Sequence, residues 1–375
     1  MDLRLRVQPG DHNIPARGYE RSIVVYLLVG TAKGLFRYQS NDRTEWKALG
    51  PVLGGDPIYT SAYDAARGIL LASVNSEFYG PSIRRSHDWG ETWDTGGSGL
   101  AYAPDDAERV TRVWSIRPTA DVIYAGVEAS GLFRSFDGGD TWEEVRALRQ
   151  HPTHETWGPG FGGKCLHTIA PDPFNPDRLY IACSAGGAYR TNDRGKTWEP
   201  INAGLRADFM PEGQQYPESG QCVHKIWVSP SQAGRMWLQN HGGVYRSDDG
   251  GDTWNDVGQS LPSDFGFPVV GDPHHPDRAY VIPLEGWPRW APDNILAVHR
   301  TDDAGQHWEP LHKGLPSPTY VSVLRDAMTA DTRDPLGLYF GTTSGSLYHS
   351  NDSGTTWNRV AQDLPRIYSV VVAEE

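Results

Sequence analysis

Three histidines and one glutamate are the strongest candidates for metal binding or acid–base catalysis in this sequence. His167 and His224 lie in two matching runs, GGKCLHTIAPDP and SGQCVHKIWVSP, each with a cysteine two residues before the histidine. His241 follows in QNHGGVY, and Glu128 lies in GVEASGLF. Imidazole and carboxylate groups on one pocket could bind zinc, copper, iron or manganese and activate a water molecule. We therefore predict His167, His224, His241 and Glu128 as metal ligands, with Glu128, His167 and His224 as catalytic groups.

Other interpretations of these residues stay open. The histidines could serve a metal-free polar pocket, or they could be structural groups that cap the backbone, because their spacing is not a local ligand motif such as HExxH. A plain glycoside hydrolase would instead need two facing carboxyl groups, about 5 Å apart for retention and about 6.5–9.5 Å for inversion. Glu128, Glu77 and Glu285 are the candidates for that pair.

Aromatic and charged side chains are predicted to line the same pocket. Aromatic rings beside carboxylates suit a sugar or another small, polar and flat ligand. Anchoring of loops by hydrophobic side chains is the alternative explanation for part of this set. The predicted substrate-binding residues are Tyr59, Glu77, Tyr79, Arg112, Trp114, Trp157, Phe267, Glu285, Trp287 and Arg289.

One octet recurs along the chain and indicates the elements that position these residues. Its pattern is S/T-x-D-x-G-x-T-W, and its copies begin 46 to 56 residues apart. The Asp accepts backbone N–H groups in a turn, the Gly takes a positive φ, and the Trp packs between sheets. The copies are SHDWGETW (86–93), SFDGGDTW (135–142), TNDRGKTW (191–198), SDDGGDTW (247–254), TDDAGQHW (301–308), SNDSGTTW (350–357) and a short SNDRTEW (40–46).

About fifty residues form one four-stranded antiparallel blade, so the repeat predicts an all-β fold. We predict a single seven-bladed β-propeller over residues 23–375, with residues 1–22 as an N-terminal tail. A strand at 24–38 has no preceding partner, and one at 366–373 has none after it. Pairing these two ends in one blade would close the ring and remove an open sheet edge.

The repeat also predicts where a site would lie. The octets mark one face of the propeller, so the pocket is expected at the channel mouth on the opposite face. Three consecutive links of 21, 25 and 26 residues would cover this mouth over the third to fifth blades. Alignment of the repeats places a ring of equivalent residues there, namely Tyr59, Trp114, His167, His224, Phe267 and Tyr368.

Composition excludes some partners. The net charge of −13 argues against nucleic acid and anionic membranes, because both need a cationic face. Three cysteines without a CxxC pair, and no apolar leader before residue 23, predict a soluble cytoplasmic protein.

The octets, together with VGTAKGLF, CLH, CVHK and SDFGFP, make the chain resemble the BNR or Asp-box superfamily. That superfamily includes sialidases, xyloglucan-active glycoside hydrolases, sortilin-type receptors and photosystem II assembly factors. The chain is most similar to bacterial proteins labelled BNR-repeat glycosyl hydrolase or exo-alpha-sialidase, from Val24 onward. The resemblance implies a propeller and a hydrolase.

The resemblance has departures that narrow the prediction. Sialidases use three arginines and a Phe-Arg-Ile-Pro segment, which this chain lacks, and only Arg112 lies near a ring position. Xyloglucan-active relatives are secreted and cut polymers between two propellers, and the assembly factors use a basic patch. We therefore predict an enzyme, with or without a metal, that acts on a small carbohydrate-like or aromatic metabolite. The alternative is a non-catalytic propeller that binds a protein or ligand.

Overall fold

The computed structural model describes residues 24–160 and 162–375, so the predicted tail at residues 1–22 lies outside the described residues. The described chain is nearly all-β and is consistent with the predicted propeller. Its helical elements are short, and none of those described could cross a membrane. They are α1 (Arg146–Arg149), η1 (His154–Thr156) and η2 (Pro292–Asn294).

Most of the strands form four-stranded antiparallel sheets. The sheet that holds both chain ends has the order β27 (Ile367–Glu374), β1 (Val25–Thr31), β2 (Gly34–Ser40) and β3 (Lys47–Val52). The next contains β4 (Ser61–Asp64), β5 (Ile69–Ser76) and β6 (Gly80–Ser86). Two meanders follow, β7 (Arg112–Pro118), β8 (Ile123–Glu128), β9 (Leu132–Ser135) and β10 (Glu143–Glu144), then β11 (Cys165–Asp172), β12 (Asn175–Ser184), β13 (Gly187–Thr191) and β14 (Glu199–Pro200). A pairing of Cys165 with Glu128 joins these two meanders.

The remaining sheets repeat the four-strand order. The first has β15 (Val223–Val228), β16 (Met236–Asn240), β17 (Gly243–Ser247) and β18 (Asn255–Asp256). The second has β19 (Gly266–Gly271), β20 (Ala279–Pro283), β21 (Val298–Thr301) and β22 (Glu309–Leu311). The third has β23 (Met328–Ala330), β24 (Leu338–Gly341), β25 (Leu347–Ser350) and β26 (Asn358–Ala361).

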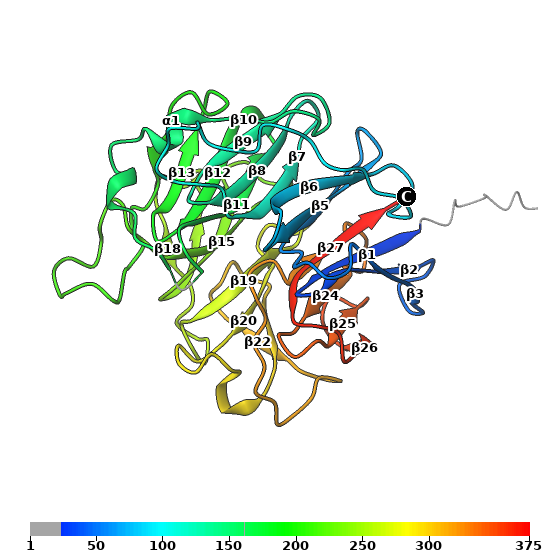
Figure 1. Ribbon diagram of the computed structural model, residues 1–375. Coiled ribbons are helices and arrows are strands. Elements are labelled where there is room, and N and C mark those ends of the chain that lie inside the picture. Colours follow the sequence, from blue (N-terminus) through cyan, green and yellow to red (C-terminus); the bar gives the residue numbers. More distant parts are fainter. Residues whose placement is uncertain (1–23, 161) are drawn as a thin grey trace, which may run out of the picture.

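The two ends of the chain lie in one sheet. Strand β1 pairs antiparallel with β27 along its whole length, from Val25 opposite Glu374 to Thr31 opposite Ile367. Figure 1 shows the red strand β27 beside the blue strand β1. The pairing that the sequence predicted between the terminal strands is therefore present, and β1 has a partner on each side.

Hydrophobic side chains fill the space between consecutive sheets. Each sheet is apolar on both faces, which is expected when blades pack against neighbours on two sides. Six hydrophobic clusters each join consecutive sheets. Pairs of buried residues that share a cluster are Leu28 with Leu70, Leu71 with Ile123, Tyr124 with Ile181, Tyr180 with Leu238, Trp237 with Val281, Tyr280 with Leu338, and Leu338 with Leu27.

The octets form the turn after the third strand of a sheet, as the sequence predicted. After β17, Ser247 Oγ donates to Asp249 Oδ1 (2.8 Å), and Thr253 donates its N–H and hydroxyl to the same carboxylate (2.9 and 2.6 Å). The indole N–H of Trp254 donates to the carbonyl of Ile201 in the preceding meander (2.8 Å). The octet therefore locks its own turn and also ties it to the neighbouring sheet.

The sheet of β4 to β6 differs from the predicted four strands, because no fourth strand is assigned to it among the described residues. The segment after its octet pairs with the next sheet instead. The backbone N–H of Ser98 donates to the carbonyl of Asp140, and the N–H of Trp142 donates to the carbonyl of Ser98 (both 2.9 Å). Gly97 permits this approach, since a side chain there would collide with the backbone of Gly139.

Candidate functional site

The inner strands share a backbone irregularity at the predicted ring positions. In the described part of the chain, the register shifts at the same place in five of these strands. An extra residue of this kind bends a strand and redirects its side chain, and such bulges often occur beside binding sites. The shifts coincide with Trp114 in β7, His167 in β11, His224 in β15, Phe267 in β19 and Tyr368 in β27.

One side of the ring is aromatic and carries a carboxylate. Tyr59 stacks on Tyr368 with ring centroids 4.5 Å apart, and it lies 4.7 Å from Trp114. The half-buried Glu128 accepts hydrogen bonds at Oε2 from Arg112 Nη1 (3.1 Å) and Trp114 Nε1 (3.3 Å). Five residues that the sequence placed near the mouth are thus in contact with one another.

The other side of the ring carries histidines and a cysteine. His224 Nδ1 lies 2.5 Å from the carbonyl oxygen of Gly266, so this nitrogen is the protonated donor. Its Nε2 lies 3.6 Å from Cys222 Sγ, and its ring centroid is 5.7 Å from that of His241. Burial, with a further contribution from the positive charge of Arg325, lowers the pKa of His224 to about 3. The imidazole is therefore neutral at physiological pH.

The neighbours of His224 are also held in their neutral forms. Burial raises the pKa of the Cys222 thiol, although nearby arginines oppose that effect. Burial and the charge of Arg289 lower the pKa of His241. At neutral pH this group therefore offers two imidazoles and a thiol.

Arg325 joins the two sides of the ring and was not singled out by the sequence. Its guanidinium lies 5.8 Å from the Trp114 ring and 5.9 Å from the Phe267 ring, and Nη1 lies 4.0 Å from Cys165 Sγ. By strand register Ala330 corresponds to Val228, so Asp326 falls at the position of His224 and Arg325 directly precedes it. That alignment is the signal that could have found Arg325.

The predicted set of metal ligands changes in the structure. Among the described residues, the donor atoms that lie within 4.8 Å of one another belong to Cys222, His224 and His241. His167 lies outside this group, and its Nδ1 is 3.1 Å from Thr168 Oγ1. Glu128 is held by its ion pair with Arg112. Two predicted ligands are therefore replaced by one cysteine.

Trp157 has a different place from the one predicted. It is 2 % exposed, and its indole N–H donates to the hydroxyl of Tyr189 (2.9 Å). Its ring packs 4.9 Å from that of Tyr189 on β13. Trp157 therefore anchors the link between β10 and β11, which is the loop-anchoring alternative rather than substrate binding.

The residues predicted on the outer turns are spread out. Glu77 and Tyr79 lie at the exposed tip of the hairpin between β5 and β6, where Tyr79 is 94 % exposed. Trp287 is 81 % exposed, and Glu285 is half-buried in the same loop. Arg289 does reach the ring, with its guanidinium 5.7 Å from the centroid of Phe267.

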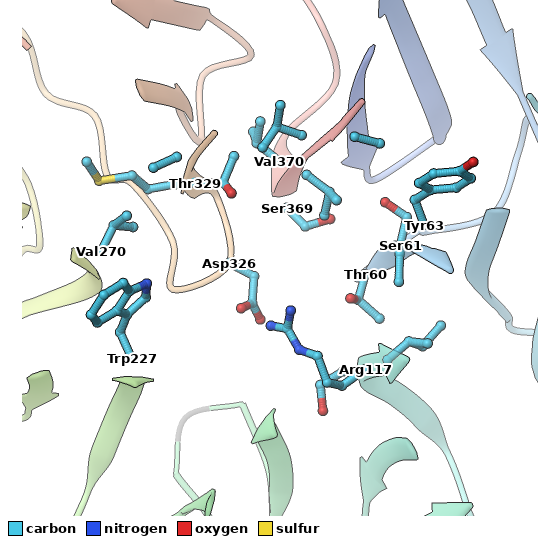
Figure 2. A pocket seen from close by; sticks show the side chains of 18 of the residues that line it. Thr60, Ser61, Tyr63, Arg117, Trp227, Val270, Asp326, Thr329, Ser369 and Val370 are labelled. Carbon is cyan, nitrogen blue, oxygen red and sulfur yellow. The ribbon is translucent and has the colours of Figure 1, made fainter. Parts of the chain in front are cut away.

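Below the ring, a cavity of about 620 Å³ is lined by residues of β4, β7, β11, β15, β19, β23 and β27. Figure 2 shows side chains from these strands around one central space, with the Arg117 guanidinium directed toward the Asp326 carboxylate. Lys225 Nζ forms an ion pair with Asp326, and Arg117 Nε donates to the carbonyl of Ile169 (3.3 Å). Arg117 and Asp326 were not predicted from the sequence, since a strand alone does not indicate which residues meet across a channel.

Several curated relatives with similar sequences are xyloglucanases. The chain is 24% identical over 320 residues to an oligoxyloglucan-reducing end-specific xyloglucanase of Emericella nidulans, across 74% of this chain and 37% of the relative. It is 30% identical over 232 residues to a probable enzyme of the same name from Neosartorya fischeri, across 60% of this chain and 25% of the relative. The chain thus spans about a third or less of their length. No family model matches it.

Solved structures show the same fold at low sequence identity. An ancestral GH74 enzyme superposes with a TM-score of 0.60 at 17% identity, over 85% of this chain and 40% of that one. A structure of YCF48 bound to D1 peptide superposes with a TM-score of 0.53 at 16% identity, over 89% of this chain and 83% of that one.

Proposed function

We propose that this chain is a glycoside hydrolase that binds a carbohydrate at the channel mouth of a seven-bladed propeller. The observation that carries the proposal is the sequence similarity to xyloglucanases, which extends over 74% of the chain in one relative. The fold shared with a GH74 enzyme supports it. The resemblance to the sialidase-like proteins of the Asp-box superfamily stays a prediction.

Two observations support the seven-bladed, closed arrangement. Residues of seven inner strands face one cavity in the described part of the chain. The hydrophobic clusters connect each sheet to the next, and the last of them, which includes Leu338 and Tyr280, returns to Leu27 of β1. A ring in which every sheet has two packed neighbours accounts for both.

The aromatic side of the ring is the proposed sugar-binding surface. Tyr59, Trp114 and Tyr368 present flat rings, which pack well against the C–H face of a pyranose while polar neighbours bind its hydroxyls. Arg325 would add hydrogen-bond donors at the centre of the mouth. A flexible aliphatic ligand would gain less from this surface.

Glu128 is the proposed reacting carboxylate. Arg112 and Trp114 both donate hydrogen bonds to it, an arrangement that suits a base or nucleophile. Gly163 lies against it, and any side chain at that position would collide with the carboxylate. Glycine therefore lets the link before β11 close over Glu128.

A second carboxyl group is required for glycoside hydrolysis. Glu285, half-buried in the loop of Trp290, is the proposed acid, because Asp326 is ion-paired with Lys225. Glu77 is less suitable because it stands at an exposed hairpin tip.

The test is release of reducing sugar from xyloglucan oligosaccharides and from a panel of aryl glycosides. Wild type should turn over at least one of these substrates, and Glu128→Gln should lower kcat by about 100-fold or more, the usual size of a lost acid–base group. Glu45→Gln, at an exposed octet position, is the matched control and should retain full rate. An unchanged rate in Glu128→Gln would contradict the assignment.

A non-catalytic binding propeller is the second candidate function. The structural likeness to YCF48 bound to D1 peptide, over most of both chains, favours it. This alternative predicts no turnover on any sugar substrate, together with saturable binding of an extended peptide that a Trp114→Ala change at the mouth weakens.

A further inference from the structure

We propose that Cys222, His224 and His241 form a three-ligand binding site for a zinc ion at the channel mouth. The site differs from the carboxylate chemistry proposed above and stands independently of it. It rests on the positions of the donor atoms, on the orientation of one imidazole and on the kinds of donor present.

The donor atoms already have the separation that a shared zinc ion requires. Zinc lies about 2.3 Å from a cysteine sulfur and about 2.0–2.1 Å from a histidine nitrogen, so two such ligands in a tetrahedron are about 3.5 Å apart. Cys222 Sγ and His224 Nε2 are 3.6 Å apart. A ring nitrogen of His241 lies within 4.8 Å of Cys222 Sγ and His224 Nε2. The His241 ring is only partly buried, and a small rotation of it would bring this nitrogen to the zinc ion.

The backbone fixes His224 in the tautomer that a metal ligand needs. A metal-bound histidine commonly donates its other ring N–H to a carbonyl or carboxylate, which orients the ring and leaves the ligating nitrogen unprotonated. His224 Nδ1 has this partner in the carbonyl of Gly266, at 2.5 Å. Its free lone pair, on Nε2, is the one directed at Cys222.

The local fold brings the three donors together from two adjacent strands. Cys222 and His224 flank Val223, which pairs with Asn240, so His241 comes directly opposite Cys222. The backbone N–H of His241 donates to the carbonyl of Cys222 (3.0 Å), which holds the two strand ends at this distance. The bulge at His224 turns its ring toward the same space.

The chemistry of the donors selects the metal. One thiolate and two imidazoles suit zinc and disfavour magnesium and calcium, which prefer oxygen ligands. Within the described residues no fourth histidine, cysteine or carboxylate joins the group, so water would take the fourth position. The charges of Arg289 and Arg325 oppose a cation, and ionisation of Cys222 on binding would offset one of them.

A thiol that simply donates a hydrogen bond to His224 is the competing explanation for the 3.6 Å contact. Cobalt(II) distinguishes the two, because a cobalt–thiolate bond gives a charge-transfer band in the near ultraviolet and a hydrogen-bonded thiol gives none. Chelator-stripped full-length protein titrated with Co²⁺ alone should develop this band and saturate at one equivalent. Zn²⁺ should then displace the cobalt and remove the band.

Variants assign the ligands. Cys222→Ala should lose the charge-transfer band, whereas Cys183→Ala, a buried thiol in another cluster, should keep it. His241→Gln should weaken Co²⁺ binding by about 10-fold or more, with the exposed His312→Gln as its control. Cys222→Ser provides a second variant at the thiol, with circular dichroism to show that it folds.

The outcomes separate this proposal from the proposed hydrolase. Absence of saturable Co²⁺ binding, or a band that persists in Cys222→Ala and Cys222→Ser, would overturn the zinc site. Sugar hydrolysis measured on the stripped wild type tests only the hydrolase. Metal binding without hydrolysis would leave the zinc site standing and remove the other proposal.

Discussion

At His224, desolvation and the charge of Arg325 disfavour the protonated imidazole, while the Gly266 carbonyl favours it. Desolvation and the charge of Arg325 together exceed the effect of the carbonyl. The folded protein therefore keeps this ring neutral down to about pH 3, whereas the unfolded chain protonates it near pH 6.5. Below pH 6.5 the unfolded state binds the additional proton, and stability falls as the pH falls towards 3.

This linkage predicts the behaviour of His224→Asn, whose side-chain N–H can still donate to Gly266. Between pH 6.5 and 4, wild type should lose up to about 1.4 kcal/mol more stability per pH unit than the variant. Denaturant unfolding at several pH values measures the free energy of unfolding of both proteins. The prediction concerns the difference between their slopes of stability against pH. Parallel curves would contradict the prediction.

Arg325 contributes an apolar stem that packs between aromatic rings and a positive charge near His224, and one substitution can separate these two contributions. Arg325→Met keeps an apolar stem between the Trp114 and Phe267 rings but removes the charge that lowers the pKa of His224. The pKa of His224 should therefore rise, yet stay below 6.5, because burial is the larger cause. Histidine NMR titration measures it, and an unchanged pKa would show that Arg325 points elsewhere in solution.

At the scale of the element, the octet turn depends on a carboxylate that must be ionised. The hydroxyl and N–H of Thr92, then the hydroxyl of Ser86, lower the pKa of Asp88 to about 2. A carboxylate with a depressed pKa stabilises the fold above its unfolded pKa of about 4 and loses that contribution as the pH falls towards 2.

Thr92→Val removes the largest cause of this shift. The variant should be less stable than wild type at pH 7, and the difference should shrink as the pH falls from 4 towards 2. Thr355→Val is the control, because the Thr355 hydroxyl donates to the backbone carbonyl of Asp352 and not to a carboxylate. Unfolding by denaturant across this range is the measurement, and a pH-independent difference for Thr92→Val would be the contrary result.

At the scale of the whole molecule, the ring depends on the contact between the chain ends. Without residues 366–375, strand β1 would lose the partner that pairs from Val25 to Thr31 and would expose an apolar edge. The truncated chain should lose cooperative unfolding and aggregate, and the synthetic peptide of residues 366–375 should restore solubility. Calorimetry and light scattering measure both, and an unaltered melting transition would contradict the closing role of β27.

The repeat made the elements predictable because its chemistry is local. Each octet contains its own acceptor, donors and glycine within eight residues, so Ser247, Asp249 and Thr253 indicated their turn before any tertiary contact was known. The missing fourth strand after Asp88 could not be predicted the same way. That segment is held by the octet of the next sheet, through Ser98, and this contact is between repeats.

The sequence by itself determined the all-β repeat, the turn chemistry, the pairing of the terminal strands and the equivalence of Trp114, His167, His224 and Tyr368. These follow from patterns that recur in every repeat. The packing of the folded chain was needed to show that Cys222 lies with His224 and His241, and that Arg325 lies between Trp114 and Phe267. Arg325, Trp114 and Phe267 come from different sheets, so no single repeat indicates their contact. Cys222 and His241 meet across two strands of one sheet, and the bulge at His224 sets the direction of its ring. Which side chains meet across a channel therefore depends on how the sheets pack together and not on any one repeat.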